Sequence, residues 1–148
     1  MHLTALRAHG CDKPSCWVSG GFVEAGVTVR LGAGWMCFKA DAHFSNAHGC
    51  KRRRAGGYCD GIAVQRQRSN RAVRLIEAKA GADLAAARPQ LAKGAAFALT
   101  VPGVAASDLV AECHCRLAPL NTIRPRKPLR VGPVLIPVHL VVNGAHRF

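Results

Sequence analysis

Acidic and aromatic residues are both scarce in this sequence. Aspartate and glutamate number 8 against 21 lysines and arginines, which gives a formal net charge of +13. This charge favours a phosphate-rich partner, nucleic acid above all; a basic surface that binds ribosomal RNA or anionic lipid without chemistry is the alternative. Aromatic residues make up 5% of the chain. That is few for a platform that stacks single-stranded bases, so contact with a duplex backbone is favoured.

The sequence also has no long apolar segment and no targeting signal. Its longest apolar stretch, residues 131–142, is interrupted by Pro133, Pro137 and His139 and is too short to cross a bilayer. Residues 1–10 lack the apolar segment of a signal peptide. We therefore expect a cytoplasmic protein with no membrane partner.

The seven cysteines include no Cys-x-x-Cys pair. In a cytoplasmic chain they are expected to be thiols rather than a disulfide framework. Cys113 and Cys115 flank His114 in a strand-like run, and we expect both to pack on one face of a sheet. A looser set of metal-ligand types occupies the first half: Cys11, Cys16, His43, His48, Cys50 and Cys59. Ordinary buried or loop cysteines are favoured there, and a structural Zn²⁺ site is the alternative.

Length and composition predict one folded domain, residues 1–148, because 49% of the residues are hydrophobic. Residues 1–56 are weakly patterned. Alternation predicts a strand over 22–31 and a short strand over 35–40, and the polar segment 43–57 is typical of an exposed loop. Residues 57–148 form the core of the predicted domain.

The core region begins with a predicted β-hairpin, formed by residues 57–65 and 71–80. A helix follows the hairpin. It begins either after Asp83 as N-cap, with Pro89 inside it, or near Arg88, with Pro89 in its first turn.

Two more strands are predicted after the helix, over residues 108–117 and 134–142, with a basic, proline-broken connection at 121–130. The last strand is strongly apolar, and we favour a place in the core over one in an interface. The order of strands and helix predicts an α/β fold with a mixed central sheet and a flanking helix.

Asp60, Glu77 and Lys79 are the strongest functional candidates. Asp60 and Glu77 belong to the two strands of the predicted hairpin, and Lys79 shares a strand face with Glu77. A carboxylate among apolar residues is unfavourable without a partner, so the pair predicts a site for a hard divalent cation. The alternatives are a solvated Glu77–Lys79 ion pair and a turn role for Asp60.

These residues resemble the PD-(D/E)xK nuclease superfamily. The matching positions are Asp60, the tripeptide Glu77-Ala78-Lys79, and Gln90 in a predicted helix; Cys59 stands where the motif has proline. The resemblance implies a restriction-endonuclease-like core and a Mg²⁺- or Mn²⁺-dependent nuclease. It implies Asp60 and Glu77 as metal ligands, Lys79 as the group beside the attacking water, and Gln90 as its support. The family often supplies a further acid from an N-terminal helix, whereas Glu24 lies in a strand-like pattern.

Basic residues outside this motif are candidates for phosphate contact. They are Lys51, Arg52, Arg53, Arg54, Lys93, Arg124, Arg126 and Lys127. We expect DNA as the substrate in preference to RNA, and a homodimer or larger assembly where both strands are cut. Two alternatives are a non-catalytic basic nucleic-acid-binding protein, stabilised by zinc, and a degenerate nuclease subunit.

Overall fold

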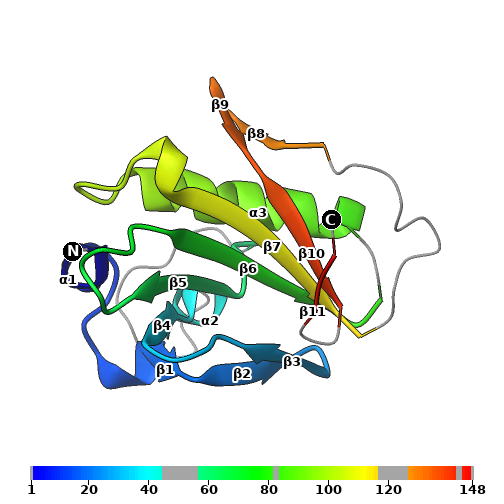
Figure 1. Ribbon diagram of the computed structural model, residues 1–148, viewed down its shortest axis with the longest axis horizontal. Helices are drawn as coiled ribbons and strands as arrows, with labels where there is room; N and C mark the ends of the chain where they lie inside the picture. Colours follow the sequence, from blue (N-terminus) through cyan, green and yellow to red (C-terminus); the bar gives the residue numbers. More distant parts are fainter. Residues whose placement is uncertain (1, 45–56, 82–83, 117–126, 143–144, 148) are drawn as a thin grey trace.

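The computed structural model describes residues 2–44, 57–81, 84–116, 127–142 and 145–147 (Figure 1). The helices in these ranges are α1 (His2–His9), η1 (Pro14–Cys16), α2 (Ala40–Phe44), α3 (Leu84–Leu99) and η2 (Ala106–Asp108). The strands are β1 (Trp17–Ser19), β2 (Gly21–Glu24), β3 (Val27–Arg30), β4 (Trp35–Phe38), β5 (Gly61–Gln65), β6 (Val73–Lys79), β7 (Leu109–Cys115), β8 (Leu129–Val131), β9 (Val134–Ile136), β10 (Val138–Val142) and β11 (Ala145–Arg147).

A seven-stranded mixed sheet organises the described residues, with the strand order β1-β4-β5-β6-β7-β10-β11. The pairs β6–β7 and β7–β10 are parallel, and the other neighbours are antiparallel. Helix α3 connects β6 to β7, as a parallel pair requires. The mixed α/β architecture expected from the sequence is confirmed. Strands β1 and β4, from the weakly patterned first third, belong to the same sheet as the predicted core.

Two different layers cover the two faces of this sheet. Helix α3 runs along β6 and β7 on one side, and the β2–β3 hairpin lies on the other (Figure 1). Leu75 of β6 and Leu91 of α3 are fully buried between helix and sheet. Val29 of β3 and Ile76 of β6 are fully buried between the hairpin and the sheet. Because successive residues of β6 point to opposite faces, both layers pack on one strand.

The strand predicted over residues 22–31 is wrong in one respect: it is two strands, β2 and β3. They pair antiparallel around a tight turn at Ala25 and Gly26, both with positive φ (50° and 71°). Hydrophobic alternation continues across this turn, which explains why the pattern looked unbroken. The segment predicted at 35–40 is β4, shorter by two residues.

Two prolines account for further differences. Helix α3 begins at Leu84 and keeps Pro89 in its interior, so the predicted start near Arg88 is wrong; Asp83 lies outside the described residues. The single strand predicted over 134–142 is two strands, β9 and β10, separated by Pro137. Its missing N–H cannot join a ladder, but its carbonyl accepts a hydrogen bond from Ala111 N at 2.9 Å.

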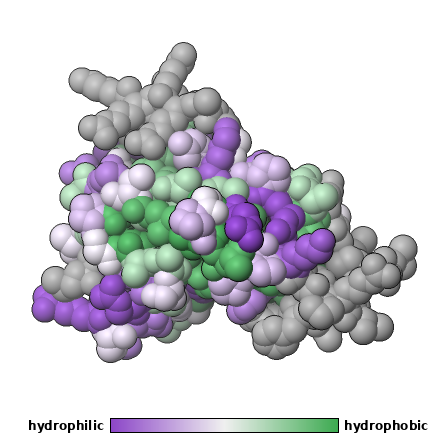
Figure 2. Space-filling view, turned by 90° about the horizontal axis from the view of Figure 1, so that it is seen from above, coloured by the Kyte–Doolittle hydropathy of each residue, from purple (hydrophilic) through white to green (hydrophobic). Residues whose placement is uncertain are grey.

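Strand β10 belongs to the core, as predicted for the apolar C-terminal segment. Leu140 is 1% exposed, whereas Leu135 of the preceding β9 is 55% exposed. Apolar residues also reach the surface when the molecule is seen from above, bordered by hydrophilic ones (Figure 2). Among the described residues no helix has the length and apolarity needed to cross a membrane.

A buried ion pair lies under the β2–β3 hairpin. Arg74 donates from Nε and Nη2 to both oxygens of Glu112, at 2.8 and 2.9 Å, and from Nη1 to Leu31 O at 3.0 Å. His114 Nε2 lies 2.9 Å from Glu112 Oε1. Burial disfavours the charged carboxylate, but the bonds from His114 and Arg74 outweigh it and lower the pKa of Glu112 to about 2. These bonds tie β6 and β7 to the end of β3.

Close packing of α3 against the start of β5 depends on Gly94. A Cβ built on Gly94 would clash with Cys59 Sγ and lie 3.4 Å from Cys59 Cβ. Gly94 follows Gln90 by one helical turn, and Cys59 precedes Asp60. The missing side chain therefore sets the distance between the helix and the residues that carry the candidate site.

We predict that Gly94→Ala destabilises the protein by about 1–3 kcal/mol, because overpacking outweighs the better helix propensity of alanine. Urea unfolding measures the loss. Gly81→Ala is the matched control, since nothing lies within 4 Å of a Cβ there and no positive φ is found. Cys59→Ala combined with Gly94→Ala should recover part of the stability; a double variant no better than Gly94→Ala would contradict the contact.

Candidate active site

The β5–β6 hairpin places Asp60 and Glu77 opposite each other. Gly61 pairs with Ile76, so the next positions along the ladder are Asp60 and Glu77. Asp60 N donates to Glu77 Oε2 at 3.1 Å, and Ala78 N donates to Asp60 Oδ2 at 2.8 Å. These reciprocal bonds fix both carboxylates at the end of the hairpin ladder. Glu77 lies in β6 as predicted, whereas Asp60 lies at a bend one residue before β5 and not within the strand predicted over 57–65.

Lys79 lies between Glu77 and Gln90. Its Nζ is 2.9 Å from Glu77 Oε1 and donates to Gln90 Oε1 at 2.7 Å. Glu77 and Lys79 share the face of β6 that packs on α3, and Gln90 lies on that helix. All four candidate residues of the motif thus form one connected group at one end of the sheet.

Burial, together with neighbouring negative charge, raises the pKa of both carboxyl groups. Burial, and then the charge of Asp60, raise the pKa of Glu77 from its ordinary 4.5 to about 7, although Lys79 opposes the change. Burial also raises the pKa of Asp60, against the hydrogen bond from Ala78. A cation more strongly charged than the Lys79 ammonium would relieve this repulsion.

Three further charged residues lie close enough to influence the pKa of Asp60: Glu24, Lys39 and Asp41. Lys39 Nζ is 3.1 Å from Glu24 Oε2 and 3.7 Å from the centre of the Phe22 ring. Asp41 N donates to Cys59 O at 3.1 Å. Four of the eight acidic residues in the chain therefore gather around this end of β5 and β6.

Sequence reasoning missed Lys39 and Asp41 and left Glu24 without a role. All three precede the motif by many residues: Glu24 ends β2, Lys39 lies between β4 and α2, and Asp41 lies in the first turn of α2. Only their place in the sequence could have indicated a role for Lys39 and Asp41, because they lie at and just after the end of the strand predicted over 35–40. That strand is β4, which pairs with β5. Glu24 lies in a strand, as its pattern indicated, and not in an N-terminal helix. Helix α1 carries no acid.

The alternative of a solvated ion pair fits poorly, because the Glu77 side chain is 3% exposed and that of Lys79 is 24% exposed. A pure turn role for Asp60 also fits poorly, because its carboxylate binds the amide of Ala78 on another strand. Glu77 and Asp60 are therefore both held by the surrounding protein and not by solvent.

Two of the predicted phosphate-contact residues are described: Lys93 belongs to α3, and Lys127 lies against it. The Nζ atom of Lys93 lies close to Gly57, three residues before Asp60: a Cβ built on that glycine would be 3.4 Å from it. The carbonyls of Lys127 and Pro128 accept hydrogen bonds from Arg88 at 2.9 and 2.8 Å, which holds that segment against the first half of the helix. The remaining candidates lie outside the described residues: Lys51, Arg52, Arg53, Arg54, Arg124 and Arg126.

The cysteine and histidine candidates for metal binding do not form one group in the structure. Cys113 and Cys115 are fully buried on one face of β7, as predicted. Cys59 is buried against α3. His43 lies in α2 and is 2% exposed, so the prediction that it belongs to an exposed loop is wrong. His48 and Cys50 lie outside the described residues.

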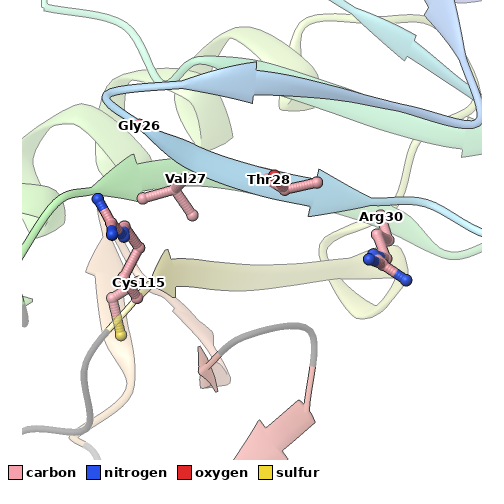
Figure 3. Close-up of a pocket in the computed structure, with 6 residues that line it drawn as sticks. Gly26, Val27, Thr28, Arg30 and Cys115 are labelled. Atoms are coloured by element: carbon pink, nitrogen blue, oxygen red, sulfur yellow. The ribbon is translucent and has the colours of Figure 1, made fainter.

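A separate pocket of about 230 Å³ lies on the opposite face of the sheet from Glu77 and Lys79. It is lined by Gly26, Val27, Thr28, Arg30, Cys115 and Arg116. Figure 3 shows Val27, Thr28 and Arg30 along β3, next to Cys115 at the end of β7. Because Lys79 pairs with Cys115, the pocket and the acidic group lie at the same end of the sheet. Two arginines give the pocket a preference for anions.

No family of proteins, curated protein or solved structure matches this chain.

The raised pKa of Glu77 predicts a pH dependence of stability. Between pH 4.5 and about 7 the folded protein holds a proton that the unfolded chain has released, so the free energy of unfolding falls as pH rises. Glutamine does not titrate, so the Glu77→Gln variant lacks this loss. Without added Mg²⁺, its free energy of unfolding minus that of the wild type should therefore increase from pH 5 to pH 8 by on the order of 2 kcal/mol.

Urea unfolding at pH 5, 6, 7 and 8 measures this difference. Asp12→Asn, which neutralises an exposed carboxylate, is the matched control and should show a nearly constant difference. A constant difference for Glu77→Gln as well would show that Glu77 keeps an ordinary pKa.

Proposed function

We propose that this chain is a metal-dependent nuclease that hydrolyses phosphodiester bonds, with DNA favoured as substrate. One observation carries the proposal: Asp60, Glu77, Lys79 and Gln90 lie in one hydrogen-bonded group. The order of elements supports a restriction-endonuclease-like core, since Asp60 leads directly into β5, the strand bearing Glu77 and Lys79 comes next, and a helix bearing Gln90 follows both.

The donor set fits a Mg²⁺ or Mn²⁺ ion. Asp60 and Glu77 would hold it, because hard cations prefer carboxylate oxygens and keep part of their water shell. Glu77 uses one oxygen for Asp60 N and the other for Lys79, while within the described residues no hydrogen bond reaches Asp60 Oδ1. When bound, such an ion polarises the phosphate and lowers the pKa of a coordinated water.

Lys79 and Gln90 have distinct roles in the proposed reaction. Hydrolysis forms a bond from a water oxygen to phosphorus and breaks the bond to a sugar oxygen, with negative charge growing on the phosphoryl oxygens. The Lys79 ammonium is partly exposed beside the carboxylates and can donate a hydrogen bond to this charge. Gln90 Oε1 accepts a hydrogen bond from one of the three N–H groups of Lys79 and so restricts the position of the ammonium.

The charge distribution favours a polyanionic substrate. Half of the acidic residues surround the site, so the remaining surface is more basic than the net charge of +13 suggests. Lys93 is exposed on α3 one turn after Gln90, and Lys127 lies against the same helix. A nucleic-acid backbone that passes along α3 would reach Lys79 with phosphate contacts on either side.

We predict that Glu77→Ala and Lys79→Ala each reduce Mg²⁺-dependent cleavage by about 10²-fold or more, because each removes a charge that acts on the transition state. Binding of duplex DNA should change little. Gln90→Ala should cause a smaller loss, since Lys79 keeps its charge. The assay uses plasmid, linear duplex, single-stranded DNA and RNA, with and without Mg²⁺ or Mn²⁺.

Arg68→Ala is the charge-matched control for Lys79→Ala, because Arg68 is exposed in the connection between β5 and β6, at the other end of the hairpin. It should retain cleavage. Undiminished cleavage by Glu77→Ala or Lys79→Ala, in protein that unfolds cooperatively, would rule out the proposed site.

A non-catalytic nucleic-acid-binding protein is the second candidate, and one observation favours it. Lys79 occupies one oxygen of Glu77, as in a purely structural ion pair. Tight, salt-sensitive DNA binding without Mg²⁺- or Mn²⁺-stimulated cleavage of any of the four substrates would establish this candidate or a degenerate nuclease subunit.

A further inference from the structure

Cys11, Cys16 and His43 converge at a buried point away from the candidate active site. Their ligand atoms all lie within 4.8 Å of one another. The Cys16 thiol donates to Cys11 Sγ at 2.9 Å, and His43 Nδ1 is 3.5 Å from Cys16 Sγ. Their exposed fractions are 8%, 0% and 2%. No other grouping of three such ligands is found among the described residues.

Three segments bring these side chains together through their own hydrogen bonds. Trp17 Nε1 donates to Cys11 O at 2.7 Å and fixes the connection after α1. Lys39 N donates to Cys16 O at 2.8 Å, and His43 N donates to Lys39 O at 2.9 Å. The backbone thus orients the ligands independently of any contact between them, as a preformed metal site requires.

We propose that Cys11, Cys16 and His43 bind a structural zinc ion. Thiolate and imidazole are ligands that zinc prefers, and Cys11 and Cys16 have the Cys-x₄-Cys spacing of structural sites. Zinc–sulfur bonds of about 2.3 Å place two sulfurs ~3.8 Å apart in a tetrahedron. The distance of 3.5 Å between His43 Nδ1 and Cys16 Sγ fits such an arrangement. The two sulfurs, now 2.9 Å apart, would need to move apart by less than 1 Å to bind the ion. The described residues leave the fourth position open.

The remaining described cysteines provide a contrast. Cys37 is also fully buried, and burial raises the pKa of its thiol to about 12, with no grouping of ligands around it. Such a thiol packs as a small apolar side chain. Cys11 and Cys16 differ because a second thiol and an imidazole share their site. The zinc would join the α1–η1 connection to α2, next to the ring of Phe38, 5.1 Å from that of His43.

Helix α2 links this cluster to the acidic group. Lys39 and Asp41 lie at its start and influence Asp60, while His43 lies two residues further on. Zinc would therefore hold one side of the candidate active site without taking part in its chemistry. The proposal does not depend on nuclease activity, and its readouts are metal content and thiol protection.

The first test measures metal in purified full-length protein. We expect about one zinc per chain, retained through gel filtration, and less than a tenth of that in Cys16→Ser and His43→Ala. Cys113→Ser, which alters a buried thiol outside the cluster, is the matched control and should retain zinc. Loading with Co²⁺ should give the visible absorption of a tetrahedral site with thiolate charge-transfer bands.

The second test uses the wild-type chain, in case a variant fails to fold. Zinc removal with a chelator should expose Cys11 and Cys16 to alkylation, mapped by peptide mass, while Cys113 stays unchanged; added Zn²⁺ should restore protection. A folded protein with less than a tenth of an equivalent of zinc and no Co²⁺ spectrum would overturn the proposal. So would a Cys11–Cys16 disulfide in the purified protein, or equal loss of zinc in Cys113→Ser.

Discussion

The reciprocal hydrogen bonds between Asp60 and the segment Glu77-Ala78 determine the position of everything else in the candidate site. They extend the β5–β6 pairing one step past Gly61 and Ile76, with side chains replacing backbone carbonyls as acceptors. Each carboxylate is thereby fixed by an amide of the opposite strand. Lys79 follows on the same face, and α3 brings Gln90 to it.

This arrangement is unfavourable by itself, because a buried carboxylate at Glu77 lies beside the partly buried carboxylate of Asp60. Burial, and then repulsion from Asp60, raise the pKa of Glu77 to about 7, and one ammonium group does not offset them. The surrounding packing sustains the arrangement: Leu75, Ile76 and Ile62 are fully buried, and Gly94 lets the helix approach Cys59 closely. A fold that sustains this repulsion supports the proposed divalent-cation site, because a purely structural contact would gain stability from neutral side chains.

The parts of the fold and site that sequence predicted are those governed by local periodicity. Alternation gave the β5–β6 hairpin and the shared face of Glu77 and Lys79. Gln90 comes from the resemblance to the PD-(D/E)xK motif and not from periodicity; in the structure it accepts a hydrogen bond from Lys79. Predictions failed where one or two residues override a pattern: Ala25 and Gly26 reverse the chain within an unbroken alternation, and Pro137 divides an apolar run. Interactions between distant segments, such as the charge of Lys39 acting on Asp60, leave no periodic signal at all.

The two proposed metal sites differ in the way their ligands would select an ion. Asp60 and Glu77 offer hard oxygens at the end of two central strands of the sheet, where water could complete the coordination of Mg²⁺. Cys11, Cys16 and His43 offer soft, deeply buried donors that Mg²⁺ does not favour. A strong chelator removes both ions, so loss of cleavage in its presence would not identify the catalytic metal. Restoration by Mg²⁺ alone, while the cluster still holds zinc, would assign catalysis to the carboxylates and stability to the thiols.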